Sequence, residues 1–87
     1  MRIIFAHSFV KRLKKIPAPV REQYYERLSM FREDRQHSIL ADHALTGEWV
    51  GHRSINVTGD YRALYREVVE GVFEFVAIGT HPELYGK

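Results

Sequence analysis

Apolar residues near the start of the chain recur first with the pattern of a strand and then with that of a helix. The β-prone run from Arg2 to Ala6 predicts a first strand. The apolar residues Phe9, Leu13 and Ile16 then recur at helical spacing, with basic residues between them. We therefore expect a short amphipathic helix that begins at a Ser8 cap and ends near Pro17.

A second helix is expected after two prolines. Pro17 and Pro19 suit a helix start. Apolar residues then step by four, four and three positions along one stripe, which consists of Val20, Tyr24, Leu28 and Phe31. This stripe predicts a longer helix that ends near Asp34.

Beyond this point glycines divide the chain into short pieces, and strand patterns replace helical ones. We expect three strands, Arg53–Val57, Tyr61–Val68 and Val72–Ile78, joined by tight turns into an antiparallel meander. The expected fold class is α+β in the order β-α-α-β-β-β. Two N-terminal helices would pack on one face of a curved antiparallel sheet and leave the other face available.

Length and composition agree with one globular domain over residues 1–87, of which 45% are hydrophobic and 28% charged. The sequence has no cysteine, which excludes disulfides, thiol nucleophiles and cysteine zinc sites and favours the cytoplasm. No apolar run approaches the roughly 20 residues of a membrane span, and the N-terminus lacks the apolar core of a signal peptide. We therefore expect no membrane association.

The net charge of +2 is unevenly distributed. Residues 1–35 carry nine Lys/Arg against four Asp/Glu, whereas residues 36–87 carry four against seven. Lys11, Lys14 and Lys15 lie on the outer face of the expected first helix. Such a surface can attract a phosphate backbone or an acidic protein segment, although a solvated helix face gives the same pattern.

The second half contains three stretches that belong together: His43–Ser54 (HALTGEWVGHRS), Gly59–Tyr65 (GDYRALY) and Ile78–Tyr85 (IGTHPELY). In this order and at this spacing they resemble the C-terminal half of YafQ-like toxins in the RelE/ParE superfamily. The segment from Phe9 to Pro17 (FVKRLKKIP) is similar to the start of the same proteins. The resemblance spans essentially the whole chain.

The resemblance implies a toxin that cleaves messenger RNA on the ribosome, by attack of the RNA 2′-hydroxyl on the adjacent phosphate, without metal or cofactor. The fold it implies is a microbial-RNase-like sheet with two N-terminal helices. It also implies a small antitoxin protein encoded by an adjacent gene, through which the complex binds operator DNA.

Such cleavage requires a base for the 2′-hydroxyl proton, donors around the phosphate and an acid for the leaving 5′-oxygen. His81, expected in a turn after the last strand, matches a functional histidine of the YafQ-like pattern and is the first choice for the acid. The RelE branch has an arginine there, so phosphate stabilisation is its second role. His43 matches another histidine and Asp60 an acidic residue of the family site. Either could be the base, and the sequence leaves this choice open.

Arg62 matches a phosphate-binding arginine of the RelE pattern. Strand alternation puts it opposite Tyr61 and Ala63, so it faces the open side if those two residues face the helices. Tyr85 matches an aromatic residue that could stack on a base. The other candidates for RNA or phosphate binding are Arg53, His52, Asn56 and Tyr61, together with the three lysines of the first helix.

Two positions depart from the YafQ-like pattern. Asn56 stands where the pattern has a histidine, and Ala77 stands where it has an arginine. Arg62 or Arg53 could replace the missing phosphate-binding group, and His52 could replace the missing histidine.

Two other functions therefore stay open. One is a ParE-like toxin that acts on DNA gyrase without nuclease chemistry, and the other is a catalytically inactive antitoxin-binding module. A zinc site made of His43, Asp60 and His81 would lack the short spacings of structural zinc sites, so we expect no metal.

Overall fold

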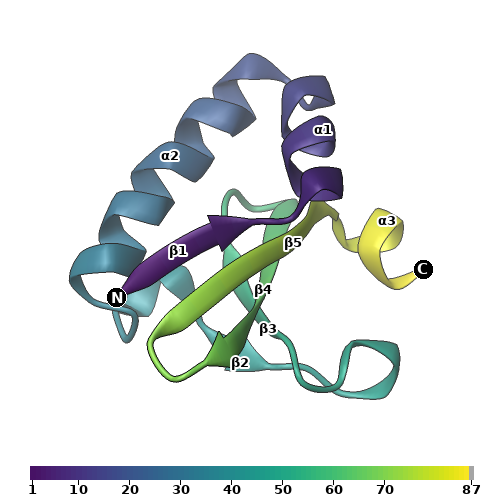
Figure 1. The fold of residues 1–87 in the computed structure, drawn as a ribbon. Coiled ribbons are helices and arrows are strands. Elements are labelled where there is room, and N and C mark those ends of the chain that lie inside the picture. The colour runs from purple at the N-terminus through teal and green to yellow at the C-terminus, as the bar shows by residue number, and fades with distance from the viewer. Residues whose placement is uncertain (87) are drawn as a thin grey trace.

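The computed structural model describes residues 1–86 and has the element order expected from the sequence, with additions near the C-terminal half (Figure 1). The strands and α-helices are, in chain order, β1 (Arg2–Phe5), α1 (His7–Lys15), α2 (Ala18–Glu33), β2 (His43–Ala44), β3 (Arg53–Asn56), β4 (Tyr61–Val69), β5 (Val72–Thr80) and α3 (His81–Tyr85). Two short 3₁₀ turns, Ser38–Leu40 and Gly47–Trp49, flank β2. The α+β class, both N-terminal helices and the three expected strands are confirmed, with strand ends shifted by one or two residues.

The five strands form one sheet in the order β1-β5-β4-β3-β2. β2 to β5 are antiparallel, whereas β1 pairs with β5 in parallel. The expectation of a purely antiparallel sheet was therefore wrong at one edge. Residue patterns within a strand do not encode whether it pairs in parallel or antiparallel. No tight turn joins β1 to its neighbour in the sheet, because α1 and α2 carry the chain from β1 toward the opposite edge.

The N-cap of the first helix lies two residues earlier than expected, so Ser8 is not its cap. Ala6 occupies the N-cap position of α1 and makes no side-chain capping bond. Its backbone N–H still donates to the carbonyl of Phe75, 3.0 Å away. The chain thus passes directly from the edge strand into the helix, and the pairing with β5 fixes where α1 starts.

An aromatic cluster joins the two N-terminal helices to the sheet. Phe75 of β5 lies at its centre, with ring centroids 5.8 Å from Phe9, 5.6 Å from Tyr24 and 5.3 Å from Phe31. All four side chains are fully buried. Figure 1 shows α1 and α2 as a helical hairpin along the sheet, with α3 following the end of β5.

A β-bulge keeps the apolar residues of β5 on the helix face. Leu64 pairs with Ala77 and Tyr65 with Phe75, so Val76 is an extra residue in β5. Without the bulge, strict alternation would put Phe75 and Ile78, which are three positions apart, on opposite faces of the sheet. Both belong to the same buried cluster.

No helix within residues 1–86 combines the length and apolar character needed to cross a membrane.

We expect Phe75→Ala to lower the free energy of unfolding by about 3–5 kcal/mol, because it leaves a cavity at the centre of the aromatic cluster. Urea unfolding followed by circular dichroism measures this loss. Val69→Ala is the matched control on the neighbouring strand, where the side chain is 63% exposed, and should change stability by no more than about 0.5 kcal/mol. Equal losses in the two variants would contradict the central position of Phe75.

Candidate functional site

The face of the sheet opposite α1 and α2 carries most of the residues that the sequence singled out. Ile55, Ala63 and Ile78 belong to the core, so their neighbours along each strand point to the other face. Strand pairing aligns these neighbours in two rows across the sheet. One row contains His43, Ser54, Leu64 and Ala77, and the other contains Asn56, Arg62 and Gly79.

A hollow of about 440 Å³ lies on this face, within the size range of small-ligand sites. Its lining comes from β2 and the loop after it, β3, β4 and α3: His43, Leu45, Thr46, Ser54, Asn56, Arg62, His81 and Tyr85. A second hollow of about 500 Å³ is lined by Gly59, Asp60, Tyr61, Arg62, Thr80, His81 and Pro82. Arg62 and His81 line both hollows and thus stand between them.

The fold therefore brings together His43, Asn56, Arg62, His81 and Tyr85, which lie up to 42 positions apart in the sequence. Asp60 and Tyr61 line the second hollow, on the other side of Arg62 and His81. The grouping agrees with the sequence-based choice of residues, and the chemical role of each stays a prediction.

His81 was expected in a turn, but it is the first residue of the helix α3. Its ring lies 4.5 Å from that of Tyr85, one helical turn later, in an edge-to-face arrangement. The two side chains therefore form one unit on α3. The expectation failed because the Gly-Thr-His-Pro sequence is as typical of a helix start as of a turn: Pro82 lies in the first turn of α3.

Four contacts hold this short helix against the molecule. Thr80 and Glu83 form a capping box, in which each side chain accepts a hydrogen bond from the backbone N–H of the other residue. Glu83 also pairs with Arg12 of α1.

The third contact is the close approach of Glu83 to Gly79. A Cβ atom added to Gly79 would lie only 3.1 Å from a carboxylate oxygen of Glu83, so a residue without a side chain permits this close approach. The fourth contact comes from the indole N–H of Trp49, which donates to the carbonyl of Leu84, 3.0 Å away.

Glu83 and Arg12 were not identified from the sequence as residues that position the site. The spacing of Thr80 and Glu83 with a proline between them is the signature of a capping box and could have revealed α3. Nothing in the sequence pattern pairs Arg12 with Glu83, because 71 positions separate them.

His43 lies in β2 at the edge of the sheet, and its side chain is exposed. Its Nδ1 atom is 2.9 Å from the carbonyl oxygen of Ala41. Because a carbonyl oxygen can only accept, this contact requires the proton on Nδ1 and leaves the lone pair of the neutral ring on Nε2.

Arg62 lies on the face opposite Tyr61 and Ala63, as the alternation predicted. Its Nη1 atom donates to the backbone carbonyls of Thr58 (2.9 Å) and Tyr61 (3.0 Å). The guanidinium is thereby held over the turn before β4, at the boundary between the two hollows.

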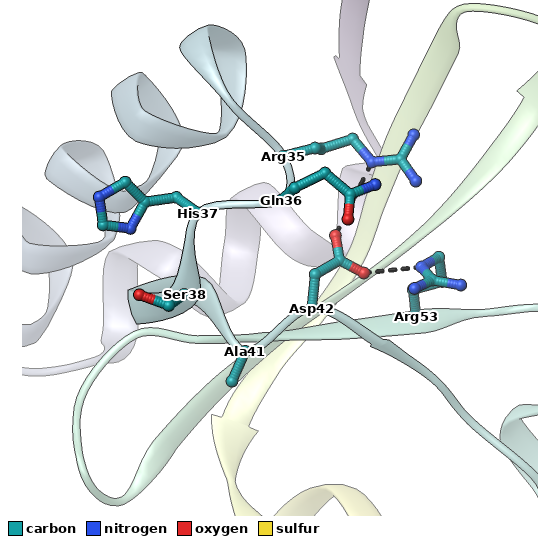
Figure 2. A pocket seen from close by; sticks show the side chains of 7 residues that line it. All are labelled: Arg35, Gln36, His37, Ser38, Ala41, Asp42 and Arg53. Atoms are coloured by element: carbon teal, nitrogen blue, oxygen red, sulfur yellow. Dashed lines mark hydrogen bonds and ion pairs between the residues drawn. The ribbon is translucent and has the colours of Figure 1, made fainter.

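Other expected members lie outside both hollows. Arg53 points to the helix side with Ile55, where its Nε atom donates to the Asp42 carboxylate 2.6 Å away (Figure 2). His52 packs edge-to-face against Trp49, with ring centroids 5.3 Å apart. Arg53 is therefore not placed on the open face, where it could have replaced a missing phosphate ligand as one of the two alternatives left by the sequence. Alternation should have excluded it, because Arg53 is two residues from a core isoleucine.

The lysines of α1 are exposed on that helix and line neither hollow. Their expected role as an attractive basic surface stays a prediction. Ala77 lies in the same row as His43, so the open face has a methyl group where the family pattern has an arginine.

Ser54 is a further residue that the sequence gave no reason to select. It pairs directly with His43 and lines the same hollow, yet it is fully buried. Its hydroxyl has no hydrogen-bond partner among the described residues. Within residues 1–86, no cluster of three or more His, Cys, Asp or Glu side chains is arranged to hold a metal ion.

Solved structures of small toxins have this fold. YafQ from E. coli superposes with a TM-score of 0.79 and 22% identity over 99% of this chain and 100% of its own. A YoeB/ParE toxin from Agrobacterium tumefaciens gives 0.75 and 18% identity over 93% and 99%. A chain of the E. coli DinJ–YafQ complex gives 0.71 and 24% identity over 99% and 100%. The chain matches no protein-family model and no curated protein.

This chain thus has the fold of these YafQ and YoeB/ParE toxin structures. The structural similarity to YafQ agrees with the resemblance of the three sequence stretches.

Glu83 should make the docking of α3 depend on pH. The backbone N–H of Thr80, and then the Arg12 guanidinium, lower the pKa of its carboxyl from 4.5 to about 2. Because the folded-state pKa lies below the ordinary value, this stabilisation is complete above pH 4.5 and is lost as pH falls through 2. We expect the fluorescence of Trp49, whose indole binds α3, to change in this window before far-UV circular dichroism reports unfolding.

Glu83→Gln removes the titrating group and is the matched variant. Its Trp49 emission at pH 7 should already approach the acid value of the wild-type protein. An identical acid transition in both proteins would contradict the role given to Glu83.

Proposed function

We propose that the protein is a YafQ-like toxin of the RelE/ParE superfamily and acts as an endoribonuclease that cleaves messenger RNA in the ribosomal decoding site. The observation that most supports this is the convergence of His43, Arg62, His81 and Tyr85 on one hollow of about 440 Å³. Two imidazoles and a guanidinium can supply the base, the acid and the phosphate donors that RNA cleavage without a metal requires, and an aromatic ring can stack on a base.

In the proposed reaction, Nε2 of His43 accepts the proton of the RNA 2′-hydroxyl as that oxygen attacks the adjacent phosphorus. The bond to the 5′-oxygen breaks, and protonated His81 gives its proton to the leaving oxygen. The products are a 2′,3′-cyclic phosphate and a 5′-hydroxyl. The hydrogen bond from Nδ1 of His43 to the Ala41 carbonyl favours His43 over Asp60 as the base, because it leaves Nε2 free to accept the proton.

Arg62 would stabilise the negative charge on the phosphate oxygens. Its Nη1 atom is held by backbone carbonyls, which fixes the plane of the guanidinium and leaves its other N–H groups for a ligand. Tyr85, packed against His81, would stack on a base and hold the acid in place. Asp60 and Tyr61 would contact the RNA in the second hollow.

A controlling partner is part of the proposal. One similar structure is a complex named DinJ–YafQ, and we propose that a cognate antitoxin from an adjacent gene binds this protein and connects it to operator DNA. The exposed lysines of α1 suit an acidic segment of such a partner. We assign the protein to the cytoplasm, where ribosomes and their messenger RNA are found.

A catalytically inactive antitoxin-binding module is the second candidate. Asn56 and Ala77 support it, because neither side chain can supply the charge or proton transfer of the histidine and arginine in the family pattern.

The test is cleavage of messenger RNA on programmed ribosomes by the antitoxin-free protein, with cut sites mapped by primer extension. We expect cuts in the decoding site and a loss of about 100- to 10,000-fold in rate for His81→Ala. His7→Ala is the control, because His7 is an exposed histidine at the start of α1 and lines neither hollow. Absence of cuts from folded wild-type protein would overturn the nuclease proposal in favour of the inactive module.

A further inference from the structure

Asp42 connects three parts of the fold through one buried carboxylate. Only 8% of its side chain is exposed. One oxygen accepts from Nε of Arg53 on β3, and the other accepts from the hydroxyl of Tyr65 on β4. Arg35, which follows α2, approaches the same carboxylate from a different direction, with Nε 3.8 Å away (Figure 2).

This arrangement holds Asp42 firmly. A buried carboxylate is tolerated only when it is paired and hydrogen-bonded, and here both oxygens have donors. The hydrogen bond to Asp42 raises the pKa of Arg53, and burial followed by its own hydrogen bond to Asp42 raises the pKa of Tyr65. Both donors therefore keep their protons, and their hydrogen bonds hold the carboxylate in this position.

The residue before Asp42 has an unusual backbone conformation. Ala41 is in the left-handed region (φ 47°, ψ 42°), and it is the one non-glycine residue with positive φ within residues 1–86. Alanine adopts this conformation only when neighbouring contacts impose it. Its N–H donates to the carbonyl of Ser38 on one side, and Asp42 is anchored on the other.

The peptide group between Ala41 and Asp42 is planar, so the Ala41 carbonyl turns together with the backbone N–H of Asp42. The left-handed conformation of Ala41 on one side and the anchored Asp42 on the other therefore restrict the direction of this carbonyl. That carbonyl is the one that lies 2.9 Å from Nδ1 of His43. Asp42 and His43 are consecutive, and their side chains lie on opposite sides of the sheet edge: one among Arg53 and Tyr65, the other in the hollow. The structure thus connects a buried charge on the helix side to the protonation pattern of a histidine on the open side.

We infer that Asp42 is a positioning residue for His43: it holds the Ala41 carbonyl against Nδ1 and thereby keeps the lone pair of the neutral imidazole on Nε2. The effect on the tautomer does not depend on the proposed function. Its consequence for RNA cleavage, through His43 as the base, rests on the proposed function.

Long-range ¹H–¹⁵N NMR spectra of the histidines at a pH where His43 is neutral test the inference directly. In the wild-type protein Nδ1 of His43 should carry the proton. In Asp42→Asn, the His43 nitrogen signals should move toward those of the Nε2–H tautomer. Asp34→Asn is the control, because it removes an exposed carboxylate that caps the turn leading to the same loop, and His43 should be unchanged.

Tyr65→Phe is a second variant in case Asp42→Asn does not fold. It removes one hydrogen bond to Asp42, keeps the charge and leaves the ring packing of a fully buried residue. We expect a smaller shift of the same sign. A folded Asp42→Asn or Tyr65→Phe protein whose His43 signals equal those of the wild type would overturn the inference and leave Asp42 as a structural anchor.

Cleavage assays on ribosomes then separate this inference from the function. We expect Asp42→Asn to lower kcat by about 100-fold or more with KM nearly unchanged, because the base loses its free nitrogen while the binding residues stay. A changed tautomer with unchanged kcat would contradict His43 as the base. If the wild-type protein does not cleave RNA, the proposed function fails while the NMR result still decides the role of Asp42.

Discussion

The packing of α1 and α2 against Phe75 determines which face of the sheet is left for function. Phe75 contacts the aromatic residues of both helices, and the bulge at Val76 is what lets it share a face with Ile78. Once that face is covered, alternation sends Ser54, Asn56, Arg62 and their neighbours to the other one. The candidate site is therefore a consequence of how the core is built.

The catalytic candidates are held by polar contacts at the borders of the sheet. α3 carries His81 and Tyr85, and it is too short to be stable alone, so its capping box and its bonds to α1 and Trp49 position it. On the opposite border, the contacts of Asp42 hold the two-residue strand that carries His43. A rigid core thus supports two small elements, each with one histidine, around the same hollow.

Local patterns in the sequence predicted the two N-terminal helices, the strands β3 to β5 and the face on which Arg62 lies. Alternation applied to Arg53 would also have excluded it from the site, since Ile55 is plainly a core residue. The parallel pairing of β1, the bulge at Val76 and the pair of Arg12 with Glu83 depend on contacts between distant segments, which periodicity does not encode. The role proposed for Asp42 depends on its burial and on its partners Arg53 and Tyr65, which are 11 and 23 positions away and which no local pattern connects to it.

The central claim is that the open face cleaves RNA through the 2′-hydroxyl of its own substrate. The most direct measurement uses programmed ribosomes whose messenger RNA carries a single 2′-deoxynucleotide on the 5′ side of a mapped cut site. We expect cleavage at this position to disappear while cuts elsewhere on the same messenger RNA persist. Undiminished cleavage at the 2′-deoxy position would mean that water or a protein group attacks the phosphate, and would contradict the chemistry assigned to His43 and His81.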